Sequence, residues 1–291
     1  MLASVRPVWV LALAVGVPPW AATEDPRDPY GFGSWEAGEL DEGLYTFRYG
    51  YTRNIFIVTD DGVIVTDPIS RDAAKRLREE IRAVTDQPVR YVVYSHEHWD
   101  HVLGAQVFVD EGAKVVSHEA CVPFFERRPH PDLVMPHLTF DGNHEIELGG
   151  RTLELIHLGR NHGECLVVMR PGGTRKLFIV DLVTAHRTPL GPLPDYHLPE
   201  YLDALRAIEA MEFDWMIGGH GPALAPRDAV TERREYLETL MAEVRRLLDD
   251  GMHWRAVPGA VELDEFAHLG GFDQNLRDNA LRIALYYQMG W

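Results

Sequence analysis

The chain has 291 residues, of which 46% are hydrophobic and 25% are charged, as is ordinary for a globular protein. This length allows one large domain or two small ones. The 45 acidic residues outnumber the 28 basic ones, and the net charge is −17. Such a charge argues against binding nucleic acid or anionic lipid by long-range attraction. An anionic substrate would have to be attracted locally, by a metal or by a few arginines.

The first residues have the pattern of an export signal. Arg6 precedes an apolar run from Val8 to Val17, and Ala21-Ala22 precede a cleavage point near Thr23. We therefore predict a signal peptide over residues 1–22 and a periplasmic or secreted protein. The alternative is a retained N-terminal anchor, although the run is too short to span a bilayer comfortably. Only in that case would we expect contact with a membrane.

Strand patterns and one helix pattern follow a Pro- and Gly-rich lead over residues 25–38. Strands are predicted at residues 43–47, 54–58 and 63–66, because β-branched and aromatic residues alternate there around turn residues. Ser70 is a candidate N-cap for a helix whose apolar stripe continues to Val84. A buried strand over residues 88–94 comes next, so the order predicts a βαβ crossover.

The second half repeats the hairpin pattern. Residues 102–109 are expected to form a short helix, 113–117 a strand, and 123–136 a loop with little regular structure. Two hairpins follow, over residues 145–155 and 164–180, each with a glycine-rich turn. The second hairpin ends in Asp181, much as the hairpin of the first half ends in Asp67. The tail from Arg227 is predicted to be helical, with a last helix over residues 275–287.

The densest group of chemically reactive side chains is His96-Glu97-His98-Trp99-Asp100-His101, directly after the buried strand. Residues two apart in a strand point to the same side, so His96 and His98 present their rings together, as two ligands of one metal need. Asp100 and His101 are adjacent, and a turn after His98 would place both beside a second ion. Crowding these groups without a cation costs desolvation and charge repulsion. The spacing therefore predicts two metal ions.

The pattern His96-x-His98-x-Asp100-His101 after an apolar strand resembles the signature of the metallo-β-lactamase superfamily. The resemblance covers roughly residues 44–222. It implies an α/β fold, a four-layer αββα sandwich with C-terminal helices outside. We accordingly predict a metallo-β-lactamase-like domain over residues 23–225 and a helical extension over residues 226–291 packed on it.

The resemblance also implies the ligand set, with His162 and His220 in glycine-flanked loops and Asp181 at a strand end. In that set, the first ion would be held by His96, His98 and His162, and the second by Asp100, His101 and His220. Asp181 would bridge both, as in the glyoxalase II-like and lactonase-like branches. Val180 departs from the family pattern, because many members have glycine before this aspartate. Two Zn²⁺ ions suit the set best, and iron or manganese also fits.

These expectations describe an enzyme, a dinuclear metal-dependent hydrolase acting on a small molecule. A metal-bound hydroxide would attack an ester-like carbonyl, with Asp100 as the catalytic residue that orients the water. β-Lactams, lactones and thioesters remain open as substrates, and no substrate-binding residue is assigned. The alternatives are a mononuclear iron dioxygenase of the same superfamily and a non-catalytic binding protein.

Two smaller features are open at this stage. Trp99 either walls the substrate pocket or packs in the core. Cys121 and Cys165 either form a disulfide, which export would permit, or serve as two small buried apolar side chains. Two cysteines do not make a disulfide framework, so we expect the second role.

Overall fold

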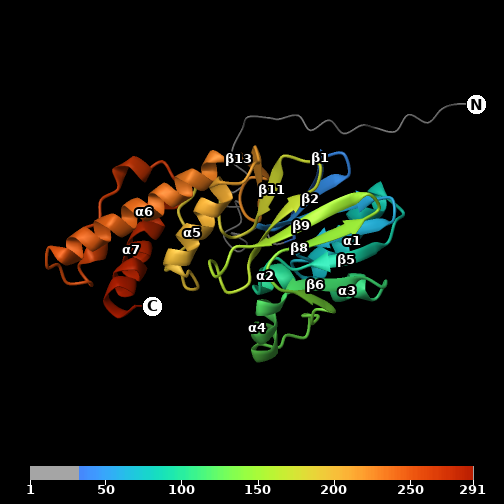
Figure 1. Cartoon of the computed structure of the whole chain (residues 1–291), viewed down its shortest axis with the longest axis horizontal. Coiled ribbons are helices and arrows are strands. Elements are labelled where there is room, and N and C mark those ends of the chain that lie inside the picture. Colours follow the sequence, from blue (N-terminus) through green and yellow to red (C-terminus); the bar gives the residue numbers. More distant parts are fainter. Residues whose placement is uncertain (1–32, 291) are drawn as a thin grey trace, which may run out of the picture.

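Two stacked sheets form the centre of the structure, a computed structural model that describes residues 33–290 (Figure 1). The predicted signal peptide lies outside the described residues. One sheet contains β1 to β7 in sequence order, and the other has the order β13-β12-β11-β10-β9-β8. Helices α1 and α3 lie on one side of the pair of sheets and α5, α6 and α7 on the other. The predicted αββα sandwich is confirmed.

The first sheet combines antiparallel and parallel strands. β1 to β4 are antiparallel neighbours, and β5, β6 and β7 continue the sheet parallel to β4. Helix α1 (Arg71–Val84) joins β4 to β5, so the βαβ crossover is confirmed, and Ser70 Oγ caps it by accepting from the Ala73 amide at 3.2 Å. The strands are β1 (Trp35–Asp41), β2 (Leu44–Tyr49), β3 (Thr52–Thr59), β4 (Gly62–Thr66), β5 (Val89–Val93), β6 (Lys114–His118) and β7 (Leu138–Phe140).

The second sheet contains both predicted hairpins. β8 to β11 form an antiparallel meander, β12 runs parallel to β11, and β13 returns antiparallel. The second hairpin begins at Val167 rather than at the expected Glu164, because the amide of Glu164 bonds instead to the carboxylate of Glu97. The strands are β8 (His144–Leu148), β9 (Arg151–His157), β10 (Val167–Pro171), β11 (Lys176–Ile179), β12 (Trp215–Gly218) and β13 (Leu224–Pro226).

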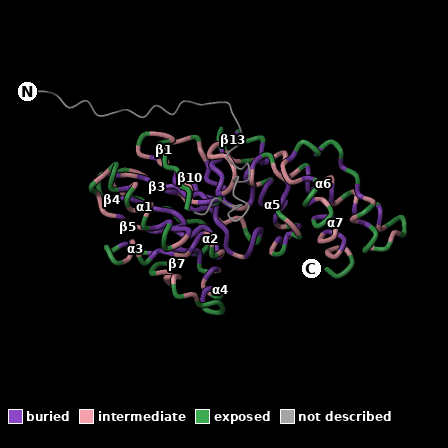
Figure 2. Tube along the Cα trace, turned by 180° about the vertical axis from the view of Figure 1, so that it is seen from behind, coloured by how far each residue is buried: buried purple, intermediate pink, exposed green. Residues whose placement is uncertain are grey.

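Alternation along the strands sends apolar side chains to three separate buried layers. In β3, Ile55 and Ile57 face the other sheet, while Phe56 faces α1. In β10, Val167 and Met169 face the first sheet, while Val168 packs against the C-terminal helices. Figure 2 shows the buried trace concentrated in the strands and in the inner faces of the helices. Because each sheet is covered on both faces, polar side chains gather where its strands end.

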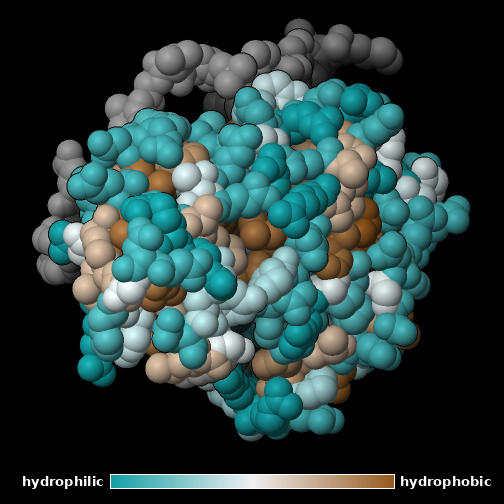
Figure 3. Space-filling model, turned by 60° about the vertical axis from the view of Figure 1, so that its left-hand side comes forward, coloured by the Kyte–Doolittle hydropathy of each residue, from teal (hydrophilic) through white to brown (hydrophobic). Residues whose placement is uncertain are grey.

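The C-terminal half adds three long helices to the outer face of the second sheet: α5 (Leu198–Glu209), α6 (Asp228–Asp249) and α7 (Phe272–Met289). A hydrogen bond of 2.9 Å from Tyr236 Oη to Asn279 Oδ1 joins α6 to α7 inside their apolar contact. The face of the molecule in Figure 3 is mostly hydrophilic, with apolar areas scattered over it. No helix within residues 33–290 combines the length and apolar character that crossing a membrane requires. The boundary predicted at residue 225, between a metallo-β-lactamase-like domain and a helical extension, stays a prediction.

Three predicted segments differ from the structure. The helix expected over residues 102–109 is two short ones, α2 (Trp99–Val102) and α3 (Gln106–Val109), because Gly104 between them has a φ of +97°. The expected loop over residues 123–136 contains α4 (Val122–Arg127), with Pro123 in its first turn, where proline is tolerated. The lead over residues 25–38 includes the start of β1.

Candidate metal centre

All seven predicted ligands come together at one edge of the sandwich, where strands of both sheets end. His96 and His98 follow β5, and α2 carries Asp100 and His101. The second sheet supplies the others: His162 lies between β9 and β10, Asp181 lies just beyond β11, and His220 lies just beyond β12. Segments far apart in the sequence thus bring five imidazoles and two carboxylates together.

One oxygen of Asp181 faces the first predicted group. Asp181 Oδ2 lies 3.3 Å from His96 Nε2, 3.3 Å from His162 Nε2 and 3.8 Å from His98 Nδ1. His98 Nδ1 and His162 Nε2 are themselves 3.2 Å apart. Ligand atoms of these four side chains all lie within 4.8 Å of one another.

The other oxygen of Asp181 faces the second predicted group. Asp181 Oδ1 lies 2.9 Å from His220 Nε2 and 3.3 Å from His101 Nε2. Asp100 Oδ2 completes this group, 3.5 Å from His101 Nε2 and 3.7 Å from His220 Nε2. The side-chain atoms therefore divide into two sets with Asp181 between them.

Several atoms that point inward are buried without a hydrogen-bond partner. Among the described residues these include His96 Nε2, His101 Nε2 and Asp181 Oδ1. Buried polar atoms are normally paired, because an unpaired one loses its hydration without compensation. Imidazole nitrogen and carboxylate oxygen are the donor atoms that zinc prefers in such sites. The residues present therefore fit two divalent cations.

The electrostatics of the cluster also favour a cation. Burial disfavours the ionised form of Asp181, but the charges of His220 and His101 outweigh it and hold its pKa well below the usual range. Burial likewise opposes the charged form of His98, but the nearby carboxylates of Asp181 and Asp195 outweigh it and raise its pKa to about 10. Protons thus occupy the cluster when no metal does, and metal binding would release them.

Outward-facing nitrogens of four of the five imidazoles meet oxygen atoms of the protein, which fixes how these rings are turned. His98 Nε2 lies 2.6 Å from Asp195 Oδ2, and His101 Nδ1 lies 3.2 Å from Asp67 Oδ2. The other two pairs are His96 Nδ1 with Ser95 Oγ at 2.8 Å, and His220 Nδ1 with the Tyr51 carbonyl oxygen at 2.9 Å. Each contact leaves the opposite nitrogen of the ring directed at the cluster.

Residues 48–220 match the family model described as the metallo-beta-lactamase superfamily. This chain belongs to the metallo-beta-lactamase superfamily. The family consists mostly of metal-dependent enzymes.

Similar proteins support this membership. The chain is 24% identical over 251 residues to the 2,4-dinitroanisole O-demethylase subunit alpha of Nocardioides sp. (strain JS1661), covering 84% of this chain and 73% of that one. It is 25% identical over 209 residues to the beta-lactamase-like protein 2 homolog of Caenorhabditis elegans, covering 71% of this chain and 65% of that relative.

A solved metallo-beta-lactamase from Pontibacter korlensis has the same fold, with a TM-score of 0.61 and 20% identity, over 68% of this chain and 96% of that one. A second, from Hirschia baltica, has a TM-score of 0.61 and 19% identity, over 69% and 96%.

The departure from the family pattern at Val180 has a local compensation. A Cβ atom on Gly219 would lie only 2.7 Å from Val180 Cγ1, so the missing side chain of Gly219 makes room for the valine. The carbonyl of Gly219 accepts a hydrogen bond of 2.7 Å from the amide of Arg53 on β3. The segment that carries His220 is thus held between the end of β11, next to Asp181, and β3 of the first sheet.

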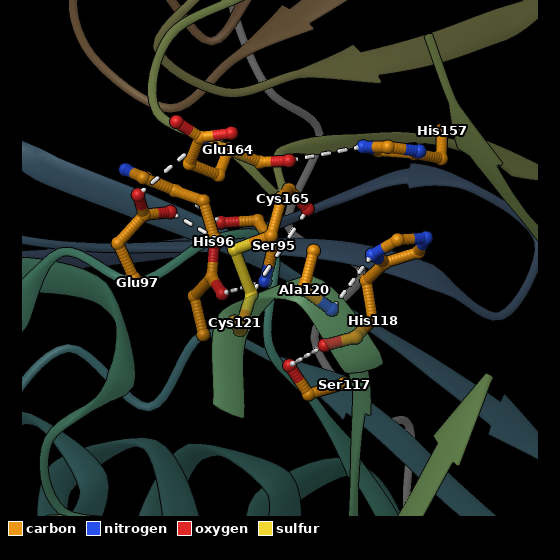
Figure 4. Close-up of a disulfide and its surroundings, with 11 residues drawn as sticks. Ser95, His96, Glu97, Ser117, His118, Ala120, Cys121, His157, Glu164 and Cys165 are labelled. Carbon is orange, nitrogen blue, oxygen red and sulfur yellow. Dashed lines mark hydrogen bonds between the residues drawn. A yellow bond between two sulfur atoms is a disulfide. The ribbon is translucent and has the colours of Figure 1, made fainter. Parts of the chain in front are cut away.

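Cys121 and Cys165 form a disulfide, so the expectation of two separate buried apolar side chains is wrong. Glu97 lies beside the bond (Figure 4), with its Oε2 2.9 Å from Cys165 Sγ. The disulfide joins the turn after β6 to the loop that carries His162. No local pattern indicates this pairing, because it depends on two segments that only the fold brings together.

A cavity of about 1170 Å³ opens over this cluster of candidate ligands. His98, Asp100, Asp181 and His220 lie in its wall, and Trp99, whose surface is 47% exposed, lines it as well. The core-packing alternative for Trp99 is therefore excluded. The cavity exceeds the volume of a typical small-molecule site, so it can hold a substrate with groups well beyond the reacting bond.

Sequence reasoning missed two carboxylates behind the cluster, Asp67 and Asp195. The sequence pattern could have pointed to Asp67, because this residue ends a hairpin in the first half of the chain just as Asp181 ends one in the second half. Its Oδ1 accepts from the Ser95 amide at 2.8 Å while its Oδ2 faces His101. Asp195 had no signal, since it lies in a loop with no regular pattern. It is held there by a hydrogen bond of 3.1 Å from the Gly163 amide to its carbonyl oxygen.

Replacing Asp195 with alanine is expected to weaken metal binding by the first group about 10- to 100-fold, as is usual when the outer partner of a ligating histidine is lost. Asp195→Asn should retain part of the affinity, because the amide oxygen can still accept from His98 Nε2. Competition with a chromogenic chelator measures the affinity. Asp203→Ala, an exposed aspartate on α5, serves as the control. Equal affinity in Asp195→Ala and the control would contradict this role.

Proposed function

We propose that this superfamily member is a dinuclear metal-dependent hydrolase that cleaves an ester-like carbonyl bond in a small molecule. The observation that carries the proposal is the position of Asp181, whose two oxygens face two separate groups of ligand atoms. A mononuclear enzyme would need only the first group. The second group, formed by Asp100, His101 and His220, would then be a costly collection of buried and half-buried polar side chains without a purpose.

Two zinc ions held by these residues would supply a nucleophile at neutral pH and polarise the carbonyl of the substrate. Asp100 faces the cavity and is the residue placed to take a proton. Burial disfavours its ionisation, but the charges of His101 and His220 lower the pKa of its carboxyl group. The carboxylate can therefore accept a proton from the attacking water and return it to the leaving group.

The substrate class stays open among β-lactams, lactones and thioesters. One relative is named for O-demethylation of 2,4-dinitroanisole, so an aryl methyl ether, which has no carbonyl, belongs in the screen as a test of a different reaction. We also propose that the protein works in the periplasm or outside the cell. The disulfide supports this location, because such bonds persist in oxidising compartments.

Elemental analysis of the purified protein, followed by a screen of chromogenic lactam, lactone, thioester and aryl ether substrates, tests the proposal. We expect close to two metal ions per chain and hydrolysis of at least one carbonyl substrate. His98→Ala should lose metal and activity, whereas His268→Ala, an exposed histidine on the C-terminal side, should keep both. Full activity of His98→Ala without bound metal would refute the proposal. A single iron ion with oxygen uptake would instead identify a dioxygenase.

A further inference from the structure

The turn that carries His220 is rich in glycine. Gly218 and Gly219 precede the histidine, and Gly221 follows it. A Cβ atom on Gly218 would lie 2.7 Å from the carbonyl oxygen of His220, and Gly221 has a φ of +78°, so both positions favour glycine. Glycines permit this tight path but do not hold it, because they restrict the backbone least. The position of His220 therefore depends on contacts from other elements.

The hairpin of β2 and β3 supplies such contacts at three successive positions of the turn. The Arg53 amide donates to the Gly219 carbonyl at 2.7 Å. His220 stacks on Tyr51, with 5.2 Å between the ring centroids, and its Nδ1 lies 2.9 Å from the Tyr51 carbonyl oxygen. Arg53 Nη2 donates to the Gly221 carbonyl at 3.3 Å. Arg53 thus holds the turn on both sides of the histidine, once through its backbone and once through its side chain.

A carboxylate from β1 fixes the guanidinium of Arg53. Arg53 is 1% exposed, and both of its terminal nitrogens lie 3.0 Å from Glu36 Oε1. The same oxygen of Glu36 lies 3.1 Å from Arg48 Nε on β2. β1 is at one end of the strand order of the first sheet. A chain of contacts therefore leads from β1, through Glu36 and Arg53, to the turn that carries His220.

The burial of Arg53 indicates that its donors have a specific role. An apolar side chain is often at least as stabilising as a buried ion pair, so stability alone does not explain an arginine here. Its planar fork of donors can bond Glu36 and the Gly221 carbonyl at the same time, which lysine cannot do equally well. His220 and Gly221 line the cavity, and Arg53 lies buried behind them. Its role is therefore directed at the turn.

We propose that Arg53, held by Glu36, is a positioning residue for the second group of metal ligands. It fixes the glycine-rich turn so that His220 Nε2 is directed at Asp181 Oδ1, 2.9 Å away. This inference rests on the proposed function, because it assumes that the second group holds an ion. It separates the two groups, since the ligands of the first group lie on other segments. Loss of the Arg53 side chain should therefore weaken one ion and spare the other.

Titration of the metal-free chain with Zn²⁺ in competition with a chromogenic chelator tests the proposal. In Arg53→Met, we expect the affinity for one ion to fall about 10- to 100-fold and the affinity for the other to change less than about threefold. Arg53→Lys should recover part of the loss, because it keeps the charge and one set of donors. Unchanged affinities in Arg53→Met would overturn the proposal. Equal weakening of both ions would show general damage to the site and would overturn it as well.

A second substitution identifies which ion is affected. His220→Ala removes the ligand itself, so it should weaken the same ion as Arg53→Met. In the His220→Ala background, Arg53→Met should change the remaining affinity by less than about twofold, since the side chain then positions no ligand. Independent losses that add in the double variant would show that Arg53 acts on another part of the site, and they would overturn the proposal.

Glu36→Gln tests the same chain of contacts without removing the arginine. It should weaken the same ion, and by less than Arg53→Met, because the bond to the Gly221 carbonyl remains. If Arg53→Met does not fold, Glu36→Gln decides, and unchanged affinities in it would overturn the proposal. The control is Arg170→Met, on β10, whose Nη1 lies 3.0 Å from Glu154. It also removes a half-buried ion pair within a sheet, and it should leave both affinities unchanged.

Measuring metal affinity keeps this result separate from hydrolysis. A chain that binds two ions and cleaves none of the screened substrates would refute the proposed function, while the affinities of Arg53→Met would still decide the inference. Two ions, full hydrolysis and unchanged affinities in Arg53→Met would overturn the inference alone. A chain that binds one ion in total would overturn both.

Discussion

Replacing Asp181 with asparagine is expected to remove most of the bound metal and to lower activity at least about 10³-fold. Asparagine preserves the volume but offers one neutral oxygen and an amino group that repels cations. Asp181 directs Oδ2 at His96 and Oδ1 at His220. A side chain that keeps only one of these oxygens therefore cannot act as a ligand in both groups. Elemental analysis after dialysis, together with steady-state rates, measures both effects.

Asp214→Asn provides the control for this substitution, since Asp214 is an exposed aspartate that pairs with Arg175. It should keep full metal content and activity. If Asp181→Asn retained two ions per chain, the bridging role would be wrong. Loss of only the second ion would instead place Asp181 in one group alone.

Removal of the disulfide is expected to lower the free energy of unfolding by about 2–4 kcal/mol. The bond closes a loop of 44 residues, and its loss enlarges the set of conformations open to the unfolded chain. The variant Cys121→Ala/Cys165→Ala avoids leaving a free thiol. Denaturant unfolding of this variant and of the unmodified protein gives the difference.

Unfolding of the unmodified protein in strong reductant is the matching control, because it breaks the same bond without a substitution. Both conditions should give similar midpoints. Because the bond fastens the loop that carries His162, we also expect the double variant to bind metal more weakly. Identical midpoints with and without the disulfide would show that it contributes little stability.

Much of the fold was predictable because it depends on local pattern. Alternation in residues 54–58 and 63–66 identifies β3 and β4, and the stripe from Ala73 to Val84 identifies α1. The predicted bounds of an element were wrong where a single residue interrupts the pattern. Gly104 interrupts the helix expected over residues 102–109 with a positive φ, and a side chain there would collide with the backbone of Ser70, which lies outside its own segment.

The candidate ligands were also predictable, because their signal is chemical and local. Three histidines and an aspartate within six positions have few explanations other than a cation, and His162 and His220 lie in loops that contain glycines. Their roles as ligands stay predictions, although the structure brings all seven together. Asp195 was not predictable, since nothing in its own loop indicates that it meets His98.

The sequence by itself determined most strands of the two sheets, helix α1, the C-terminal helices and the residues able to hold metal, because hydrophobic periodicity and ligand chemistry are properties of short segments. Only the tertiary structure decided which carboxylates turn the imidazoles and which cysteines pair. Each of these depends on a distance between segments far apart in the chain. Such distances arise from the packing of two sheets and their helices, and no local pattern specifies them.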